Sequence, residues 1–348
     1  MAEIQWQRYP LLSQNHLARK QLTIEAALGH ARNTIDAYAR GREDFFVFCA
    51  THNVAPELAG KEIASLWVRD LLSRPRRIRN NAAESQLCSG LANATVQQRA
   101  TSVRLYFDFV IEQGRRRDNP VGRGRYAASS RCMTIHRRGL VPRYQKLPWI
   151  PSDEQMTTIL EAMRSEPLRN RLMFCLAYDA ALRREELCTL HIDDFDFAHR
   201  LLRIRSEVAK GRRERIVPYS SSSATLLSTY LCFRRALSIR PGALFLSESR
   251  RNRCNPLTIW TWSKTVNRIA RHTGVTRFTT HTLRHLCLTD LARSGWDIHD
   301  IATFAGHKSI EATKIYIHLT GRDLAEKIRR GMDQIHRWRT ELIEAGLR

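Results

Sequence analysis

A segment rich in arginine, glycine and proline interrupts an otherwise helical sequence about one third of the way along it. Residues 115–146 hold ten Lys or Arg against a single acid, Asp118. Glycine and proline recur through the segment and break regular structure. A chain of 348 residues is long enough for two folding units on either side of such a break. We therefore predict a first domain over 1–120, a basic linker over 121–148 and a second domain over 149–320.

The first domain is predicted to be all-helical. Apolar residues recur at helical spacing over 31–51, 61–73 and 92–113. Asn33 or Thr34 is a candidate cap for the first of these helices, because a short oxygen-bearing side chain accepts hydrogen bonds from free first-turn amides. The preceding residues form only a moderately amphipathic lead-in, so we expect about four or five helices.

The second domain is predicted to combine helices with one β-hairpin. LLRIRSEVA (201–209) and ERIVPY (214–219) are strand-like, and Lys210-Gly211 separates them, which indicates a hairpin with a basic turn. The expected fold class is mainly α with a small antiparallel β-sheet in this domain. Helices are predicted at 151–163, 167–182, 222–238, 256–273, 282–294, 297–305, 309–317 and 321–342, the last within a tail over 321–348.

Charge and composition restrict the class of protein. The formal net charge is +23, well beyond the roughly 2–8 charges that keep a small domain soluble, so we expect a polyanionic partner. None of the eight cysteines forms a CxxC pair, so neither a zinc site nor a disulfide framework is predicted. No run approaches the ~20 apolar residues that span a bilayer, and the N-terminus lacks an apolar signal core. We predict a cytosolic protein associated with nucleic acid.

The basic linker has two interpretations. It is either a disordered tether or a strap along DNA, and we favour the strap because each phosphate contact releases a counterion and strengthens binding. The candidate DNA contacts in the linker and the hairpin turn are Arg115, Arg116, Arg117, Arg123, Arg125, Arg137, Arg138, Arg212 and Arg213.

Groups suited to phosphate chemistry gather in residues 281–316. His281, Arg284, His285, His307 and Tyr316 lie in this stretch, and on a helix the first three share one face. A helical tyrosine is usually a core residue with a wet hydroxyl. A phenol that attacks phosphorus needs its proton removed and needs cations around the non-bridging oxygens, and arginine meets the second need because it stays charged and matches phosphate geometry.

Two further residues are candidates upstream. Arg183 follows an apolar run, where a charge is costly unless it is paired or used, and Glu186 lies three residues on, so a simple ion pair is the alternative. Lys210 in the hairpin turn is able to protonate a leaving oxygen, although nothing local excludes a plain surface lysine. Metal binding by His281 and His285, four residues apart, is weakly supported because Arg284 between them repels a cation. No metal or other cofactor is predicted.

Taken together and in order, these residues resemble the tyrosine recombinase (phage integrase) family. ALRREEL matches the family's first arginine box, AKGRRERIVP its hairpin lysine motif, HTLRH its H-x-x-R box and AGHKSIEATKIYIH its last box. Each box alone is weak evidence, whereas four in order at plausible separations are strong evidence. The departures are Ala180-Ala181 for the usual Thr-Gly and Ala312-Thr313 for Thr-Thr, and neither alters a catalytic position.

The resemblance implies a site-specific DNA recombinase with two domains in a C-shaped clamp, a helical SAM-like core-binding domain and a catalytic domain. Tyr316 would attack a DNA phosphate to form a 3′-phosphotyrosyl link, with neither ATP nor metal. The implied roles are oxygen clamps for Arg183, Arg284 and His307, an acidic companion for Glu186, a general acid for Lys210 and a proton acceptor or hydrogen-bond partner for His281.

The resemblance also implies partners and leaves rivals open. The partner is double-stranded DNA, and the apolar stripe of the tail over 321–348 either covers its own domain or docks on a neighbouring protomer, which gives a tetramer on paired sites. The protein would act in the prokaryotic cytosol, associated with the nucleoid, in phage integration, transposition or chromosome resolution. A type IB topoisomerase, a telomere resolvase and a catalytically silent DNA-binding clamp are the alternatives.

Overall fold

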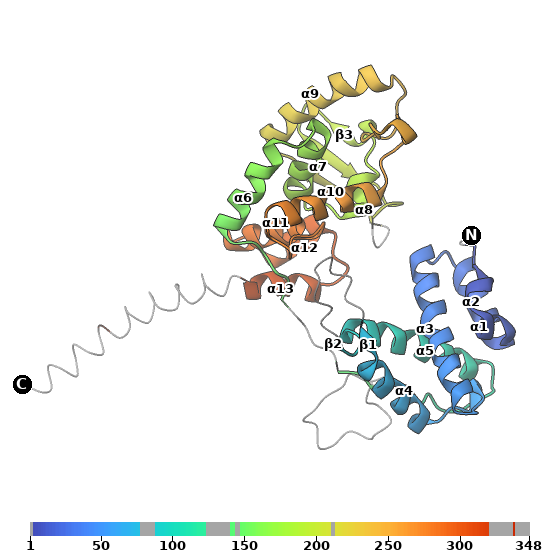
Figure 1. Cartoon of the computed structure of the whole chain (residues 1–348). Coiled ribbons are helices and arrows are strands. Elements are labelled where there is room, and N and C mark those ends of the chain that lie inside the picture. Colours follow the sequence, from blue (N-terminus) through green and yellow to red (C-terminus); the bar gives the residue numbers. More distant parts are fainter. Residues whose placement is uncertain are drawn as a thin grey trace, which may run out of the picture. The chain divides into compact units, whose positions relative to one another are not determined.

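The computed structural model describes residues 3–76, 88–122, 140–142, 147–209, 213–319 and 337. The chain divides into two compact units, Met1–Gln145 and Lys146–Arg348, and each is described by itself (Figure 1). Most of the predicted basic linker, Lys210 and nearly all of the tail lie outside the described residues. Within the described part of the chain, no helix is long and apolar enough to cross a bilayer.

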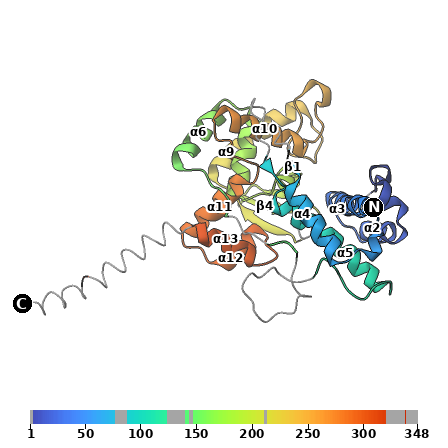
Figure 2. The same ribbon diagram turned by 60° about the horizontal axis from the view of Figure 1, so that its bottom comes forward.

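The first unit is built from helices. Its helices are α1 (Pro10–Gln14), α2 (His16–Ala27), α3 (Arg32–Thr51), α4 (Lys61–Ser73) and α5 (Asn93–Glu112), with 3₁₀ turns at Trp6–Arg8 and Pro56–Leu58. The short strands β1 (Pro75–Arg76) and β2 (Cys88–Ser89) pair antiparallel. The long helices α3 and α5 pack against each other, as Figure 2 shows.

Aromatic side chains fill the core between these helices. Phe45 of α3 makes edge-to-face contacts with Trp67 of α4 and Phe107 of α5, at ring-centroid distances of 5.1 and 5.9 Å, and such pairs add stability beyond the area that they bury. Arg42 of α3 is fully buried and pairs with Glu25 of α2 at 2.8 Å. This unit therefore depends on one buried ion pair as well as on apolar packing.

Two described pieces of the predicted linker, residues 121–122 and 140–142, pack on the first unit. Val121 and Val141 are buried in the same apolar core, and Gln97 of α5 donates a hydrogen bond to the Pro142 carbonyl. The chain thus returns to α5 before it continues to the second unit.

The second unit is larger and contains the predicted hairpin. Its helices are α6 (Asp153–Arg164), α7 (Leu168–Asp179), α8 (Arg184–Cys188), α9 (Ser221–Leu237), α10 (Ile259–His272), α11 (Thr282–Arg293), α12 (Ile298–Ala305) and α13 (Glu311–Leu319), with 3₁₀ turns at Ile192–Asp194 and Arg250–Asn252. Strands β3 (Phe195–Asp196), β4 (Leu201–Ile204) and β5 (Arg215–Pro218) form an antiparallel sheet in the order β3-β4-β5.

The sheet register follows from alternation in the sequence. Leu202 faces Val217 across the β4–β5 pair, and both are fully buried. Because side chains alternate along a strand, the same register places Arg215 on the inner face, where it is 8% exposed. The hairpin therefore carries a charged side chain into the unit instead of displaying it to solvent.

The expected fold class, mainly α with a small antiparallel sheet in the second domain, is confirmed. The predicted cap of the helix at 31–51 is wrong. That helix begins at Arg32 with Ala31 at the N-cap position and no side-chain cap bond, so Asn33 and Thr34 lie inside its first turn. The lead-in before residue 31 is more ordered than predicted, because it contains α1 and α2.

Candidate active site

Helices α11, α12 and α13 gather at one place in the second unit, as both Figure 1 and Figure 2 show. They form a small apolar cluster of their own, in which Tyr316 of α13 packs with Leu288 of α11 and Ile301 of α12. Tyr316 is only 3% exposed. On packing alone it is a core residue, so any chemical role depends on what surrounds its hydroxyl.

Arg284 of α11 lies beside this cluster and is 4% exposed. Its guanidinium donates to the backbone carbonyls of Ala181 and Ala305. Burial and the nearby charge of Arg183 lower the pKa of Arg284 to about 10, so it remains charged at neutral pH. The two carbonyls hold the group in a fixed orientation, which is the preorganisation that stabilises developing charge.

His307 connects Arg284 to the tyrosine. Arg284 donates to Nε2 of His307 at 3.0 Å, and the other ring nitrogen, Nδ1, bonds Thr313 Oγ1 at 2.8 Å. An arginine has no acceptor, so Nε2 is the unprotonated nitrogen and Nδ1 carries the hydrogen. The imidazole stacks on the ring of Tyr316, with centroids 6.1 Å apart and planes 6° from parallel.

Electrostatics around His307 keep it neutral. Burial lowers the pKa of His307 to about 4, and the charges of Arg284 and Arg183 act in the same direction. A neutral imidazole with a protonated Nδ1 is therefore the resting form. An anion bound at this position would reverse the electrostatic preference and favour the imidazolium.

Arg183 and Glu186 are held together at the start of α8. Glu186 is fully buried and accepts from Arg183 Nη1 at 2.8 Å and from the Arg183 backbone amide at 2.9 Å. Arg183 also donates to the carbonyl of Gly306 at 3.2 Å. The arginine box is thereby linked to the turn that carries His307.

A second arginine, Arg215 of β5, completes the pairing of Glu186. Its Nη1 and Nη2 donate to the two carboxylate oxygens at 3.1 and 2.7 Å. Burial alone would raise the pKa of Glu186, but the hydrogen bonds from Arg215 and the charge of Arg183 hold it at about 2. The buried carboxylate is thus an anion that fixes two guanidinium groups.

Gly306 permits the close approach of Arg215. Its φ of +62° is left-handed and ends α12, a conformation that glycine adopts at little cost. A Cβ at this position would lie 3.1 Å from Arg215 Nη1. The turn before His307 therefore needs glycine for its backbone and for the space beside it.

The two histidines of HTLRH occupy different environments. His281 is exposed at the N-cap position of α11. His285, one turn further along the helix, is partly buried, and its Nδ1 lies 3.0 Å from the Tyr316 hydroxyl. The ring centroids of the two histidines are 6.4 Å apart.

A cavity of about 340 Å³ adjoins this centre. Its charged lining residues are Arg213, Arg215 and Lys308, against one acid, Glu214, and His307 also lines it. The excess of positive charge favours an anion.

The structure gathers Arg183, Glu186, Arg284, His307 and Tyr316 at one centre and leaves His281 at its exposed edge. Lys210 lies between β4 and β5 outside the described residues, so its position is not described.

Sequence reasoning missed two contacts, those of Arg215 with Glu186 and of His285 with Tyr316. Period-two alternation in RIVP places Arg215 on the same face as Val217, which was the available signal for the first. His285 lies one turn from His281 in the same helix, which was the available signal for the second.

The candidate DNA contacts have mixed environments. Arg115, Arg117 and Arg213 are exposed. Arg116 is occupied within the first unit, where it donates to the carbonyls of Glu57 and Ala59 and lies over the Phe107 ring. The other five candidates lie outside the described residues, four in the linker and one in the hairpin turn: Arg123, Arg125, Arg137, Arg138 and Arg212.

Within the described residues, no group of three or more His, Cys, Asp or Glu side chains is placed to hold a metal ion. The centre is instead a set of guanidinium, imidazole and phenol groups around one buried carboxylate. Cations preorganised around a nucleophilic oxygen are suited to phosphoryl transfer. This combination of a mostly helical two-unit fold and an Arg–His–Tyr centre defines a class of enzyme that attacks phosphodiesters with a side chain.

Comparisons with known proteins agree with that class. Residues 151–322 match the model of the phage integrase family. The tyrosine recombinase XerC of Thermodesulfovibrio yellowstonii is 27% identical over 308 residues, which cover 87% of this chain and 91% of the relative. The tyrosine recombinase XerA of Pyrococcus furiosus is 32% identical over 186 residues, or 53% of this chain and 62% of the relative.

Solved structures show the same fold. The site-specific recombinase XerH, bound to its difH substrate after cleavage, aligns with a TM-score of 0.65 at 20% identity and covers 92% of this chain and 86% of that one. The Tn1549 transposon integrase with transposon-end DNA aligns with a TM-score of 0.63 at 17% identity, covering 90% and 98%. The chain belongs to the phage integrase family of tyrosine recombinases. It is an enzyme of site-specific DNA recombination by strand breakage and rejoining.

Proposed function

We propose that Tyr316 is the nucleophile of this recombinase and forms a 3′-phosphotyrosyl link with DNA. The observation that carries the proposal is the stacking of Tyr316 on His307, which in turn accepts a hydrogen bond from Arg284 at 3.0 Å. A phenol beside two groups that are able to bind a phosphate supports this role.

The arginines supply the charge that the transition state needs. Attack by Tyr316 adds negative charge to the non-bridging oxygens, and Arg183, Arg284 and His307 stabilise it. Both guanidinium groups are already fixed by protein acceptors, Arg183 by Glu186 and Arg284 by backbone carbonyls. Little reorganisation is therefore required when DNA binds.

Lys210 is the proposed acid for the leaving 5′-oxygen. This role comes from the family motif that it matches, and the geometry of its neighbours supports it. Arg215, which is bonded to Glu186 in the centre, follows Lys210 by five residues in the sequence. That separation is short enough for a lysine side chain to be able to reach the same region.

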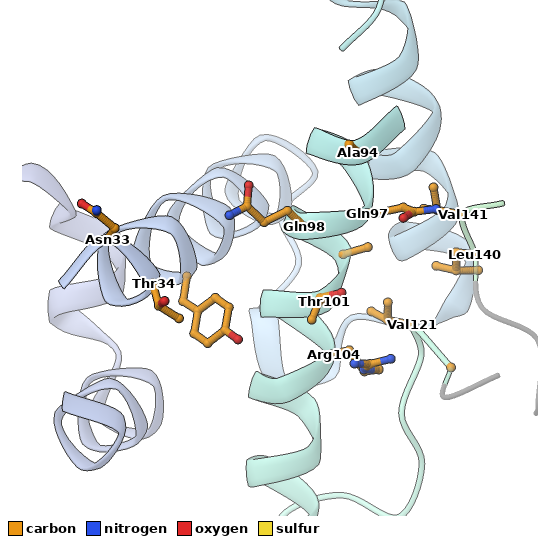
Figure 3. A pocket seen from close by; sticks show the side chains of 13 residues that line it. Asn33, Thr34, Ala94, Gln97, Gln98, Thr101, Arg104, Val121, Leu140 and Val141 are labelled. Carbon is orange, nitrogen blue, oxygen red and sulfur yellow. The ribbon is translucent and has the colours of Figure 1, made fainter. Parts of the chain in front are cut away.

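The N-terminal unit is proposed to bind DNA through a groove between α3 and α5. A cavity of about 570 Å³ lies there (Figure 3), with Asn33 and Thr34 contributed by α3 and Gln98 and Arg104 by α5. Asn33 and Gln98 are exposed, and amide side chains pair with adenine in the major groove. Arg115 and Arg117 would add phosphate contacts near the end of α5, whereas Arg116 is engaged within the unit.

Boundaries, assembly and location complete the proposal. We propose a DNA-binding domain over 1–120, a linker over 121–148, a catalytic domain over 149–320 and a docking tail over 321–348. The active assembly is a tetramer on two paired DNA sites, and the protein acts at the bacterial or archaeal nucleoid. Its net charge of +23 supports the DNA partner, and mass photometry on paired sites would count the protomers.

The test is a covalent trapping experiment. Full-length protein is incubated with a pool of nicked duplexes of random sequence, and DNA that remains attached after denaturation is recovered and sequenced. We expect an adduct with wild-type protein, with EDTA present, and none with Tyr316→Phe. Tyr178→Phe is the matched control, because Tyr178 lies in the same unit with its hydroxyl bonded to Asp290. Failure of the wild type to form an adduct, or an adduct with Tyr316→Phe, contradicts the proposal.

The recovered site also separates recombination from its rivals. A supercoiled plasmid with two copies of the site should yield excised circles. Relaxation without exchanged products would indicate a topoisomerase.

A further inference from the structure

His285 contacts the hydroxyl of the proposed nucleophile, Tyr316, but has no role in the proposed mechanism. Its Nδ1 lies 3.0 Å from the hydroxyl oxygen of Tyr316, and the two ring centroids are 5.8 Å apart. Arg284 and His285 are consecutive on α11, so this helix presents a phosphate-binding cation and an imidazole to the same centre. The contact joins α11 to α13, which lie 31 residues apart along the chain at these two positions.

The tyrosine needs a proton acceptor. Burial raises the pKa of Tyr316, although the charges of Arg284 and Arg183 lower it. The phenol is therefore protonated at neutral pH, and attack requires its proton to move during the reaction.

His285 is in the right protonation state to accept it. Burial, with smaller contributions from the charges of His281 and Arg284, lowers the pKa of His285 to about 4. It is neutral at physiological pH and has one unprotonated ring nitrogen. A DNA phosphate bound between Arg183 and Arg284 would add negative charge nearby and raise the basicity of His285 when the proton is transferred.

The other histidines are less suited. Both ring nitrogens of His307 are already engaged, by Arg284 and by Thr313. His281 is exposed at the start of α11, with its ring centroid 6.4 Å from that of His285. Among the described residues, His285 Nδ1 is the histidine nitrogen within hydrogen-bond distance of the Tyr316 hydroxyl.

The groups that contact His285 or act on its charge are His281 and Arg284 of α11, Tyr316 of α13, and His307 before α13. Other charged and titratable groups of the surrounding elements act on these neighbours: Cys287 and Asp290 of α11, Tyr178 of α7, Arg183 before α8 and Arg215 of β5.

We propose that His285 is the general base for Tyr316, a role that the family resemblance assigns to His281. The inference rests on the proposed function of Tyr316. As the phenol oxygen bonds to phosphorus, its hydrogen passes to Nδ1 of His285, the bond from phosphorus to the 5′-oxygen breaks, and that oxygen takes a proton from Lys210. In the rejoining step the 5′-hydroxyl gives its proton to the now neutral Lys210 as its oxygen bonds to phosphorus, the phosphotyrosyl bond breaks, and His285 returns its proton to Tyr316.

The substitution His285→Asn distinguishes a general base from a residue that only positions the tyrosine. The side-chain amide oxygen of His285→Asn takes the place of Nδ1 and accepts the hydrogen bond, but it cannot hold a proton. We expect His285→Asn to lower the single-turnover rate of cleavage of a nicked substrate by about 10²–10⁴-fold with unchanged DNA affinity. Its rate should then rise about tenfold per pH unit, because hydroxide replaces the missing base, whereas the wild-type rate reaches a plateau. His272→Asn, at an exposed position of α10, is the control and should match the wild type.

A second variant addresses folding. His285→Ala leaves a hole, and added imidazole should restore cleavage in proportion to its neutral fraction. A bridging 5′-phosphorothiolate, which departs without protonation, should rescue Lys210→Ala but not His285→Asn, because the defects lie at opposite ends of the reaction.

Three outcomes overturn the inference. In the first, His285→Asn cleaves DNA within threefold of the wild-type rate and with the same pH profile. In the second, His285→Ala binds DNA normally but is not rescued by imidazole. In the third, the changed pH profile is seen with His281→Asn instead of His285→Asn. If Tyr316→Phe still forms adducts, the proposed function fails instead, so the two failures are distinguishable.

Discussion

Replacing Glu186 with glutamine exchanges one carboxylate oxygen for an amide nitrogen. Among substitutions this small at the active centre, we expect it to destabilise the second unit most. Glu186 is fully buried and accepts from Arg183 and Arg215. The amide keeps one acceptor oxygen, but it turns donor hydrogens toward two guanidinium groups and leaves them without an anion. Truncating one partner of a buried ion pair typically costs about 3–5 kcal/mol.

The titration of Glu186 gives a second measure of the same magnitude. Its pKa is held at about 2 instead of 4.5, and each pKa unit corresponds to about 1.4 kcal/mol. The carboxylate form is therefore favoured by folding by about 3 kcal/mol, at the low end of the range for buried pairs. We take roughly 3 kcal/mol, because the Arg183 side chain is 16% exposed and water screens part of its charge. For a unit of this size the loss corresponds to a fall in melting temperature of roughly 6–12 °C.

The assay is thermal unfolding by calorimetry, together with hydrogen exchange of peptides that cover α8 and β5. Glu185→Gln is the matched control, because Glu185 is exposed on the same helix and its replacement removes the same charge. The folded-state pKa of Glu186 is depressed, so its contribution is present above about pH 4.5 and is lost as the pH falls through about 2. The difference between wild type and Glu186→Gln should shrink accordingly. A melting temperature for Glu186→Gln within 2 °C of that of Glu185→Gln would refute the reasoning.

Further predictions concern backbone strain, the first unit and pH. Gly306→Ala should lower the free energy of unfolding by roughly 1–2 kcal/mol because of its left-handed backbone, and further because the new Cβ meets Arg215. Gly295→Ala is the control, since Gly295 is also at positive φ but has nothing near its Cβ. Urea unfolding of the two variants separates the backbone contribution from the contact. Arg42→Ala should cost about 3–5 kcal/mol by leaving Glu25 buried and unpaired, and calorimetry would contradict this with an unchanged melting temperature. His285, with a folded pKa of about 4 below its ordinary 6.5, takes up a proton more readily when unfolded, so stability should fall as pH drops from about 6.5 to 4 and less so in His285→Asn. Replacing Asn33 or Gln98 with alanine should relax the recovered DNA sequence by about 1–3 kcal/mol per base without loss of adduct, with exposed Gln113→Ala as control.

Local pattern was sufficient where one face of an element is apolar. The helices at α3, α4 and α5 and the β4–β5 hairpin follow directly from spacing and alternation. The helix α2 was harder to predict because its buried face carries polar residues. Gln21 donates to the Leu105 carbonyl and Glu25 pairs with Arg42, so both are satisfied inside the core by partners on other helices. Such positions look exposed to any argument from hydropathy alone.

The site shows the same division. Most residues of the centre could be listed from motifs, and the Arg183–Glu186 pair from its spacing, whereas the contacts between residues far apart in the sequence could not. Arg215 lies 29 residues from Glu186, and His285 lies 31 residues from Tyr316. An arginine such as Arg215 is expected to face solvent unless a buried partner for its charge is known. The motif alone offers His281 as a proton acceptor or hydrogen-bond partner, whereas the 3.0 Å contact of His285 with the phenol follows from the packing of α11 against α13.

Charge balance at the centre explains why these groups can remain together before DNA arrives and what DNA contributes. Arg183, Arg215 and Arg284 place three positive charges around one carboxylate, Glu186, and the lowered pKa of Arg284 reflects burial and the repulsion from Arg183. Glu186 neutralises one charge and leaves an excess of two. A phosphodiester brings one negative charge, and the proposed attack by Tyr316 would add a second to the non-bridging oxygens. The excess therefore matches the transition state better than the bound substrate, and that difference is the condition for catalysis by binding energy.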